Sequence, residues 1–390
     1  MSVTDYREVT ACRLCDSTEL EQVLDLGQTP LANELDGTEL FPLVVNRCGS
    51  CGHHQLSIAV SPERLWGPGY PYQSGTSPVF RAHLEKLADE VAALKPGGRV
   101  LEIASNDGTL CEMLHQRGLG VTGVDPSGPD VPGVLLREAW PGDCLPILLG
   151  GARQEKPFDV ILALNVFAHV DDLHSFTAAV KEALAPDGVF ILEVGYLPSV
   201  VNRGHFDVLY HEHFSYHTIG PLIAFFRRHG LKIEKAQIVE SQGGSVRLYV
   251  GHDHMIVPHI SVANEGTPDW EAFSHMINSR AAALHEALNK LFHRGEMVCV
   301  YGAPAKLTTL LYATGLQDMP FNCVGDDNPR KVGRTTPGNH IPIVSVEDML
   351  ARKPDTILVA SWNFFEDIRR KLRDMGFKGG IINPMGDIHG

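Results

Sequence analysis

A regular alternation of apolar and amphipathic segments runs through the middle of the chain and restricts its fold more than any other feature. The stretch RVLEIASNDGTLCEMLHQRG predicts a strand at 99–103, a turn of small polar residues, and then a helix. Further strands are expected at 121–128, 158–169 and 188–195, with a helix at 172–185. Apolar strands that alternate with helices are typical of a doubly wound, mainly parallel sheet. We therefore predict an α/β protein with a Rossmann-like central domain.

The same pattern starts again in the last third of the chain. A helical periodicity at 268–293 precedes predicted strands at 297–306 and 356–361, which indicates a second Rossmann-like α/β domain. Residues 62–78 are rich in turn-forming residues and separate a short first segment from the rest. A chain of 390 residues has room for two or three domains. We expect three, with these bounds: 1–62, 63–255 and 256–390.

The first segment contains two C-x-x-C pairs. Each pair is able to place two thiolates on one tight turn, and two such turns complete a tetrahedron around Zn²⁺. The ligands predicted from this spacing are Cys12, Cys15, Cys48 and Cys51. Four thiolates leave no open coordination position, so we expect a structural zinc; a redox dithiol pair is the alternative reading. The N-terminus has no apolar signal segment, so we expect a cytoplasmic protein with reduced cysteines.

Composition narrows the class of partner. The net charge is −14, which argues against a nucleic acid or an anionic membrane because phosphate groups bind basic surfaces. The apolar segments are too short to span a bilayer. We therefore expect a small-molecule substrate. The sequence is nearly silent on oligomeric state and is compatible with a monomer.

The turn after the first predicted strand of the central domain is the expected cofactor site. Ligands of an open α/β sheet bind at the carboxyl ends of the strands, and an acid after the second strand is placed to accept from ribose hydroxyls. Acidic side chains repel a pyrophosphate but suit a ligand with an amino group and a positive sulfur, and the turn that follows the 99–103 strand is not G-x-G-x-x-G. This favours S-adenosylmethionine (SAM) over a dinucleotide. The predicted contacts are Glu102, Ala104, Ser105, Asn106, Asp107, Gly108, Asp125, Pro126 and Asn165; turn formation and helix capping are the alternative for Glu102 and Asp107.

Several short motifs occur in an order that resembles a known family. These are the paired C-x-x-C motifs, YPYQSGTS, LEIASNDGTL, NVFAHV, YHEHFSY, GGSVR, YGAPAK and DDNP. They resemble the three-domain, zinc-containing sugar C-methyltransferases, which act on nucleotide-linked ketodeoxysugars in antibiotic biosynthesis. The resemblance covers nearly the whole chain. It implies a zinc-binding domain, a central SAM-binding domain, a C-terminal domain of related fold that binds no methyl donor, and an active site between the domains.

Three positions depart from the pattern of that family. Ala104 stands where a glycine is usual, Leu307 follows the GAPAK lysine in place of a glycine, and Gln242 replaces a histidine before GGS. The last change is compatible with a different sugar or a different acceptor. An O-, N- or C-methyltransferase acting on another natural product is therefore the alternative function. A zinc-ribbon interaction protein without catalysis and a dinucleotide oxidoreductase are more distant alternatives.

Methylation at carbon needs a base that removes a proton next to a carbonyl group, so that an enolate attacks the methyl donor. The segment LYHEHFSY supplies the candidates, and the resemblance places Tyr210, Glu212 and His213 in the active site. We expect His213 to be the base, because imidazole titrates near neutral pH, and Glu212 to orient a histidine or hold a sugar hydroxyl. Tyr210 and His169 are candidate donors to the enolate oxygen. In an extended segment Tyr210, Glu212 and Tyr216 would share one face, whereas a turn would mix them.

The remaining site predictions concern the acceptor. Tyr72 is assigned to the catalytic groups, and the residues predicted to bind substrate are Tyr70, Tyr216, Arg247 and Lys306. Four of them have a structural alternative: aromatic packing at a domain junction for Tyr70 and Tyr72, a hairpin with a surface side chain for Arg247, and solvation for Lys306. His211, Glu212 and His213 have metal-ligand spacing, but no third ligand is evident for a catalytic metal.

Overall fold

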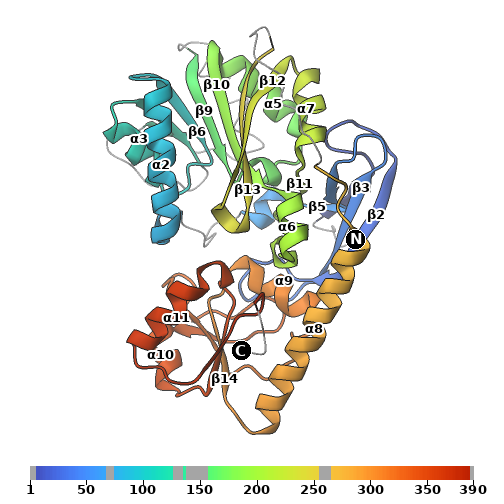
Figure 1. The fold of residues 1–390 in the computed structure, drawn as a ribbon, viewed down its shortest axis with the longest axis vertical. Coiled ribbons are helices and arrows are strands. Elements are labelled where there is room, and N and C mark those ends of the chain that lie inside the picture. Colours follow the sequence, from blue (N-terminus) through green and yellow to red (C-terminus); the bar gives the residue numbers. More distant parts are fainter. Residues whose placement is uncertain (1–5, 67–73, 126–134, 138–156, 254–264, 387–390) are drawn as a thin grey trace.

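The computed structural model describes residues 6–66, 74–125, 135–137, 157–253 and 265–386. It has three sheet-containing parts, which follow one another along the chain in Figure 1 and share long interfaces. Tyr70, Tyr72 and Pro126, all predicted site residues, lie outside the described ranges. None of the helices in the described ranges is both long and apolar enough to cross a lipid bilayer.

The N-terminal part is built on short antiparallel strands. One pair joins β1 (Tyr6–Glu8) to β5 (Ile58–Val60). The four-stranded sheet has the order β11-β4-β3-β2, with the bounds β2 Leu20–Thr29, β3 Phe41–Cys48, β4 His54–Leu56 and β11 Ser215–Tyr216. Because β11 comes from a segment more than one hundred and fifty residues further along the chain, this sheet is completed by the central part. Helix α1 (Pro62–Leu65) follows β5.

The central part is a seven-stranded sheet with the order β12-β13-β10-β9-β6-β7-β8. Its strands are β6 Arg99–Ile103, β7 Gly120–Val124, β8 Leu135–Arg137, β9 Phe158–Leu164, β10 Leu184–Gly195, β12 Leu231–Val239 and β13 Ser245–His252. Strands β8, β7, β6, β9 and β10 are parallel, and β13 and β12 are antiparallel additions at one edge. The predicted doubly wound, mainly parallel sheet is confirmed.

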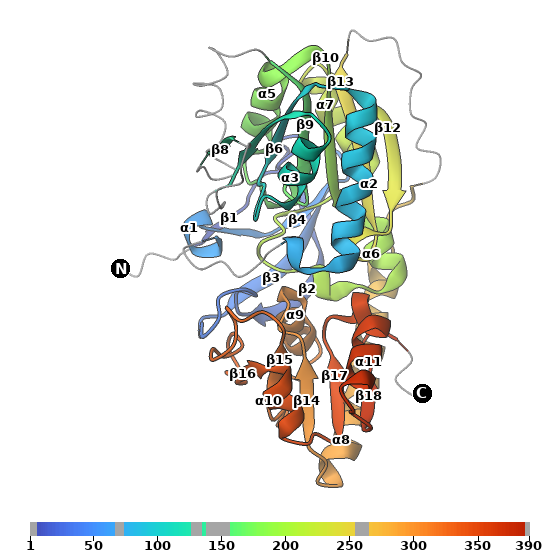
Figure 2. The same cartoon turned by 90° about the vertical axis from the view of Figure 1, so that its left-hand side faces the viewer.

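Helices cover both faces of this sheet (Figures 1 and 2). They are α2 Pro78–Leu94, α3 Thr109–Gln116, α5 Leu173–Ala183 and α7 Ile219–Arg228. Helix α6 Leu197–Arg203 lies beyond the sheet, toward the C-terminal part. Strand β9 shows why two layers form: Val160 and Leu162 pack with α2 and α3, whereas Ile161 and Ala163 pack with α5 and α7. Side chains that alternate along a fully apolar strand therefore fill two separate cores.

The C-terminal part is a five-stranded parallel sheet with the order β16-β15-β14-β17-β18. Its strands are β14 Val298–Tyr301, β15 Val324–Asp326, β16 Ile343–Ser345, β17 Thr356–Val359 and β18 Gly380–Ile382. Its helices are α8 Trp270–His293, α9 Ala305–Ala313, α10 Val346–Ala351 and α11 Phe365–Asp374. The predicted long strand at 297–306 is shorter than expected because the chain turns at Gly302, whose φ is +89°, and α9 begins at Ala305.

One buried cluster joins the three parts. It contains Leu43 and Val45 of β3, Leu197 of α6, Leu284 of α8 and Leu310 of α9. Helix α9 also packs on β2 and on the short 3-10 helix η3 (Phe206–Val208). The C-terminal part therefore rests on both the N-terminal and the central part, and this junction forms one side of the site described next.

Candidate active site

A cavity of about 250 Å³ opens at the carboxyl ends of the central parallel strands. Its described walls come from all three parts of the chain. The polar and aromatic residues among them are Trp66, Ser74, Phe80, Glu102, Ser105, Asn106, Asp125, Asn165, His169, His205, Tyr210, His213, Ser215, Tyr216, Gln242 and Lys306. Six of the nine predicted cofactor contacts line it: Glu102, Ala104, Ser105, Asn106, Asp125 and Asn165.

The turn after β6 forms one wall. The backbone N–H of Asn106 donates to Asp125 Oδ2 at 2.9 Å, and the N–H of Ser105 donates to the carbonyl of Val124 at 3.0 Å. These bonds tie the turn to the end of β7 and hold both acids, Glu102 and Asp125, at the cavity. Burial raises the pKa of Glu102 to about 8, and the charges of Asp107 and Asp125 add to this effect, while the Cys111 thiol opposes it by donating to its carboxyl group at 2.9 Å.

Asp107 and Gly108 are not among the cavity-lining residues. Asp107 accepts from the N–H and the hydroxyl of Thr109 at the start of α3, and from the N–H of Gly75 at 2.7 Å. Gly108 has φ +75° and begins the helix. Both residues therefore form the turn and the start of the helix. For Asp107 this is the alternative to cofactor binding that the sequence left open.

Four cavity-lining residues other than glycine have a left-handed backbone. They are Ala104 (φ +56°), Asn106 (φ +51°), Asn165 (φ +55°) and Gln242 (φ +52°). Asparagine tolerates this conformation better than alanine, for which it costs about 1–2 kcal/mol. Two of the three departures from the family pattern, Ala104 and Gln242, thus lie at strained positions on the cavity wall, where the sequence alone could not place them.

A tight turn presents the predicted catalytic group. The N–H of His213 donates to the carbonyl of Tyr210 at 2.9 Å, so the two side chains are three residues apart on one turn, and their ring centroids lie 4.1 Å apart. The ring of His169 meets His213 edge to face, with centroids 4.9 Å apart. Tyr210, His213, His169 and Tyr216 all line the cavity. Glu212 does not: it is buried on the other side of the turn and accepts from the Asn33 amide at 2.6 Å. Tyr210 and His213, which would lie on opposite faces of an extended segment, therefore both line the cavity in this turn.

His213 has one defined tautomer. Its Nδ1 lies 2.7 Å from the carbonyl oxygen of Val208, and a carbonyl only accepts, so Nδ1 carries the proton and Nε2 carries the lone pair. Burial lowers the pKa of His213 to about 4, and the nearby charge of Lys306 contributes, whereas the bond to Val208 opposes the shift. The pKa of His169 is also well below its usual value because of burial. Both rings are therefore neutral at physiological pH.

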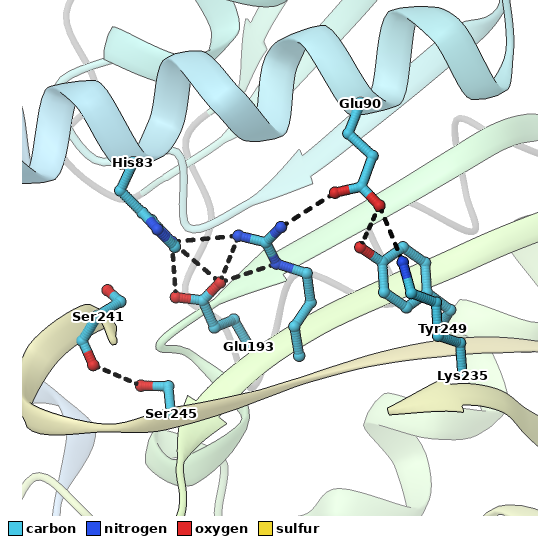
Figure 3. Close-up of polar contacts among 8 residues, drawn as sticks. His83, Glu90, Glu193, Lys235, Ser241, Ser245 and Tyr249 are labelled. Atoms are coloured by element: carbon cyan, nitrogen blue, oxygen red, sulfur yellow. Dashed lines mark hydrogen bonds and ion pairs between the residues drawn. The ribbon is translucent and has the colours of Figure 1, made fainter. Parts of the chain in front are cut away.

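Arg247, predicted to bind substrate, is not among the cavity-lining residues. It is buried in a network with His83, Glu90 and Glu193, which are labelled in Figure 3. Its guanidinium group contacts Glu193 at 2.9 Å and Glu90 at 3.2 Å, and it lies 3.2 Å from His83 Nε2. Tyr249 donates to the Glu90 carboxylate at 2.6 Å. His83 and Glu90 belong to α2, so the network fastens that helix to β10 and β13. Helix α2 in turn brings Phe80 and Leu84 to the cavity wall.

The four cysteines of the C-x-x-C pairs come together outside the cavity. Their sulfur atoms lie within 4.8 Å of one another, with 3.6 Å between Cys12 and Cys51 and 3.5 Å between Cys15 and Cys48. A tetrahedral site with Zn–S bonds of about 2.3 Å requires sulfur separations of about 3.8 Å, so this cluster fits a zinc ion. Cys12 and Cys48 pack into the core of the central part, which suits a structural role. No other metal-ligand cluster occurs within the described ranges, the H-E-H segment included.

Three family models match the chain in the same order as its sheets. Residues 12–66 match "Putative zinc binding domain", residues 76–236 match "Methyltransferase domain", and residues 240–384 match "C-methyltransferase C-terminal domain". C-methyltransferase NovU of Streptomyces niveus is 30% identical over 406 aligned residues, which cover 96% of this chain and 94% of NovU. The chain belongs to the zinc-containing C-methyltransferase family. As a C-methyltransferase of this family it uses SAM as methyl donor, and its four-cysteine cluster holds a structural zinc.

Other relatives of this C-methyltransferase cover less than half of the chain. A ubiquinone biosynthesis O-methyltransferase of Paramagnetospirillum magneticum is 32% identical over 117 residues, which are 29% of this chain and 46% of that protein. The solved structure of the CcbJ methyltransferase from Streptomyces caelestis is 18% identical with a TM-score of 0.34, covering 43% of this chain and 88% of that one.

Sequence reasoning missed several residues at the cavity of this C-methyltransferase. Trp66 lines the wall beside His169, with ring centroids 5.8 Å apart. His205 lines it as well and packs on Trp362, with centroids 4.1 Å apart. His205 stands five residues before Tyr210 in a segment already dense in polar aromatic residues, a signal that could have found it. Nothing in the local sequence connects it to Trp362, which lies in the C-terminal part.

Proposed function

We propose that this C-methyltransferase methylates a carbon next to the keto group of a nucleotide-linked deoxysugar, with dTDP as the carrier, through an enolate. The reaction would serve antibiotic sugar biosynthesis in the cytoplasm. The observation that carries the proposal is the tautomer of His213. Its Nδ1–H donates a hydrogen bond to the carbonyl of Val208, so the lone pair is on Nε2. Because His213 lines the cavity, this ring is able to accept a proton from a bound acceptor.

His213 is held in place by its neighbours. Tyr210 packs against its ring, His169 meets its edge, and the bond to Val208 fixes its rotation. A base that is neutral and orientated before the acceptor binds loses little entropy at the moment of proton transfer. Tyr210 is positioned at the same wall to donate to an acceptor oxygen, and His169 offers a second polar group. The low pKa that burial gives His213 means that proton transfer also requires stabilisation of the enolate.

The donor side of the cavity is acidic and small. When bound, SAM supplies a methyl group on a positively charged sulfur, which a nucleophilic carbon displaces. Glu102 and Asp125 are the acids at the ends of adjacent strands β6 and β7, and the turn between them carries Ala104, Ser105 and Asn106. Asp125 would hold the ribose hydroxyls, and Glu102 would face the positive amino acid end. Asn165, at the end of β9, completes this wall.

The acceptor would enter where the three parts meet. His205, Gln242 and Lys306 line this side of the cavity, together with Tyr216 of β11. A wall with several polar and aromatic groups suits a hydroxylated ring better than an apolar acceptor. Domain boundaries near residues 62 and 255 are part of this proposal, since they put the active site between the predicted domains.

The test is a transfer assay with SAM labelled with ¹³C at its methyl group. A set of dTDP-linked ketodeoxysugars serves as acceptors, and the product is analysed by two-dimensional NMR. The proposal predicts a labelled methyl group bonded to a carbon next to the keto group. A label on oxygen or nitrogen would support the alternative methyltransferase functions instead.

A further inference from the structure

Lys306 is a half-buried cation on the cavity wall. It lies in the first turn of α9, in the C-terminal part, and its Nζ is shielded from solvent. Among the described residues, no side chain or backbone atom accepts a hydrogen bond from this Nζ. A buried ammonium group without an acceptor is costly, so a group of this kind is expected to find its partner in a ligand.

The residues around Lys306 pack against it but accept no hydrogen bond from its Nζ. Its Nζ lies 4.7 Å from the ring centre of Trp362, and the Trp362 indole N–H donates to the carboxylate of Asp207. Asp207 is fully buried, and its Oδ1 has no hydrogen-bond partner in the described chain. The Asp207 charge opposes the effect of burial, which lowers the pKa of Lys306. Lys306 and Asp207 thus bring opposite charges to the junction of the C-terminal and central parts without a hydrogen bond between them.

Lys306 also lies close to the proposed base. Its positive charge lowers the pKa of both His213 and His205, the two histidines on its side of the cavity. Among the cavity-lining residues that the structure describes, Lys306 is the only lysine or arginine. The single cation among these residues therefore lines the same cavity as His213.

We propose that Lys306 binds the carbonyl oxygen of the acceptor and stabilises the enolate that forms when His213 removes the neighbouring proton. This inference rests on the proposed function. The C–H bond breaks and its electron pair forms the enolate double bond, while the carbonyl π pair moves to the oxygen beside Lys306. The proton goes to Nε2 of His213. The enolate carbon then bonds to the methyl carbon, the sulfur keeps the electron pair of the broken S–C bond, and the carbonyl group forms again.

Charge balance favours this role over binding of the acceptor's diphosphate. Asp207 already supplies a negative charge that acts on Lys306, so a diphosphate there would bring uncompensated negative charge into a buried place. An enolate forms together with a protonated His213, and that pair adds no net charge. A preorganised cation at a developing oxyanion acts mainly in the transition state, where it accelerates the reaction. The C-terminal part, which is expected to bind no methyl donor, would then supply a catalytic residue.

The test measures exchange of the acceptor's α-proton with D₂O, without methyl donor, on the same dTDP-linked ketodeoxysugars. Lys306→Met and Lys306→Ala are expected to slow exchange by about 100-fold, the usual effect of removing one oxyanion donor, while binding of S-adenosylhomocysteine (SAH) stays unchanged. Added methylammonium should restore part of the rate to Lys306→Ala and none to Lys306→Met. The matched control is Lys371→Met: Lys371 also lies over a ring, that of Tyr301 at 5.7 Å, but outside the cavity, and its loss should leave exchange unchanged.

The outcomes separate this inference from the function on which it rests. Variants that bind SAH and exchange at the wild-type rate, or that lose only acceptor affinity, would overturn the role of Lys306 and leave the proposed function standing. Failure of the wild-type protein to exchange the α-proton of any of these acceptors would overturn both. Loss of SAH binding in both variants, with no rescue by methylammonium, would show a structural role and would also overturn it.

Discussion

Glu193 and Arg247 face each other across neighbouring antiparallel strands. They are direct partners in the β10–β13 register, and their side chains form an ion pair at 2.9 Å in which Glu193 is fully buried and Arg247 nearly so. Through Glu90 and His83 the same pair reaches α2, which carries part of the cavity wall (Figure 3). The pair therefore connects sheet stability to the shape of the active site.

Arg247→Met should lower the free energy of unfolding by about 3–5 kcal/mol, because it leaves the Glu193 charge buried without its main partner. Chemical denaturation measures this. The matched control is Arg203→Met, which removes an ion pair with Glu240 on the surface and should cost about 0–1 kcal/mol. A loss of acceptor affinity in Arg247→Met without a loss of stability would instead support the sequence-based prediction that Arg247 binds substrate.

Zinc binding should depend on the four clustered cysteines alone. Cys48→Ser removes one ligand whose side chain is also part of the central core, so the variant should lose its metal and unfold at a lower temperature. Elemental analysis should find about one zinc per chain in the wild-type protein and much less in the variant. Cys299→Ser alters a buried cysteine of the C-terminal core and should keep its zinc. Equal zinc content in the two variants would argue against this site.

Ala104→Gly should stabilise the protein by about 1 kcal/mol, because glycine adopts the left-handed backbone at this position without steric cost. The opposite change, Gly108→Ala at φ +75°, should destabilise it by a similar amount. Thermal denaturation of both variants without ligand measures the difference. Equal or opposite shifts would show that the turn after β6 does not hold this conformation in solution.

Affinity for SAM should increase as the pH rises toward about 8 and level off above it. Glu102 has its pKa raised to about 8, so its carboxyl group is mainly protonated below that pH in the donor-free protein. A positively charged ligand favours the carboxylate, so binding should release a proton and become tighter as the pH increases. Calorimetry in buffers of different ionisation enthalpy measures the release. Glu102→Gln should abolish it; release that persists in this variant would assign the proton to another group.

Some features were predictable from sequence because they depend on neighbouring residues. The strand at 99–103 and the helix that follows Gly108 are both present, since apolar runs and capping residues act over one or two turns of chain. The four cysteines were predictable because metal spacing is local within each pair. The predicted boundaries near 62 and 255 stay a prediction, and strand β11 shows that the N-terminal sheet recruits residues from the central part.

Other features depend on residues far apart in the chain. The sequence could not show that the turn at Tyr210 would put His213 in the cavity and Glu212 against Asn33, because both faces of that segment are polar. It could not show that Arg247 meets Glu193, since that contact depends on strand register. Nor could the sequence show that Trp362 of the C-terminal part bonds to Asp207 of the central part, or that Lys306 and His213 line one cavity.

The central claim, that His213 removes an α-proton before methyl transfer, is tested most directly by exchange with D₂O in the absence of methyl donor. Wild-type protein should exchange the acceptor's α-proton. The exchange rate should stay constant through pH 6.5, because burial lowers the pKa of His213 to about 4. His213→Gln should bind SAH normally and exchange about 10²–10⁴ times more slowly. Exchange by His213→Gln at the wild-type rate would contradict the account.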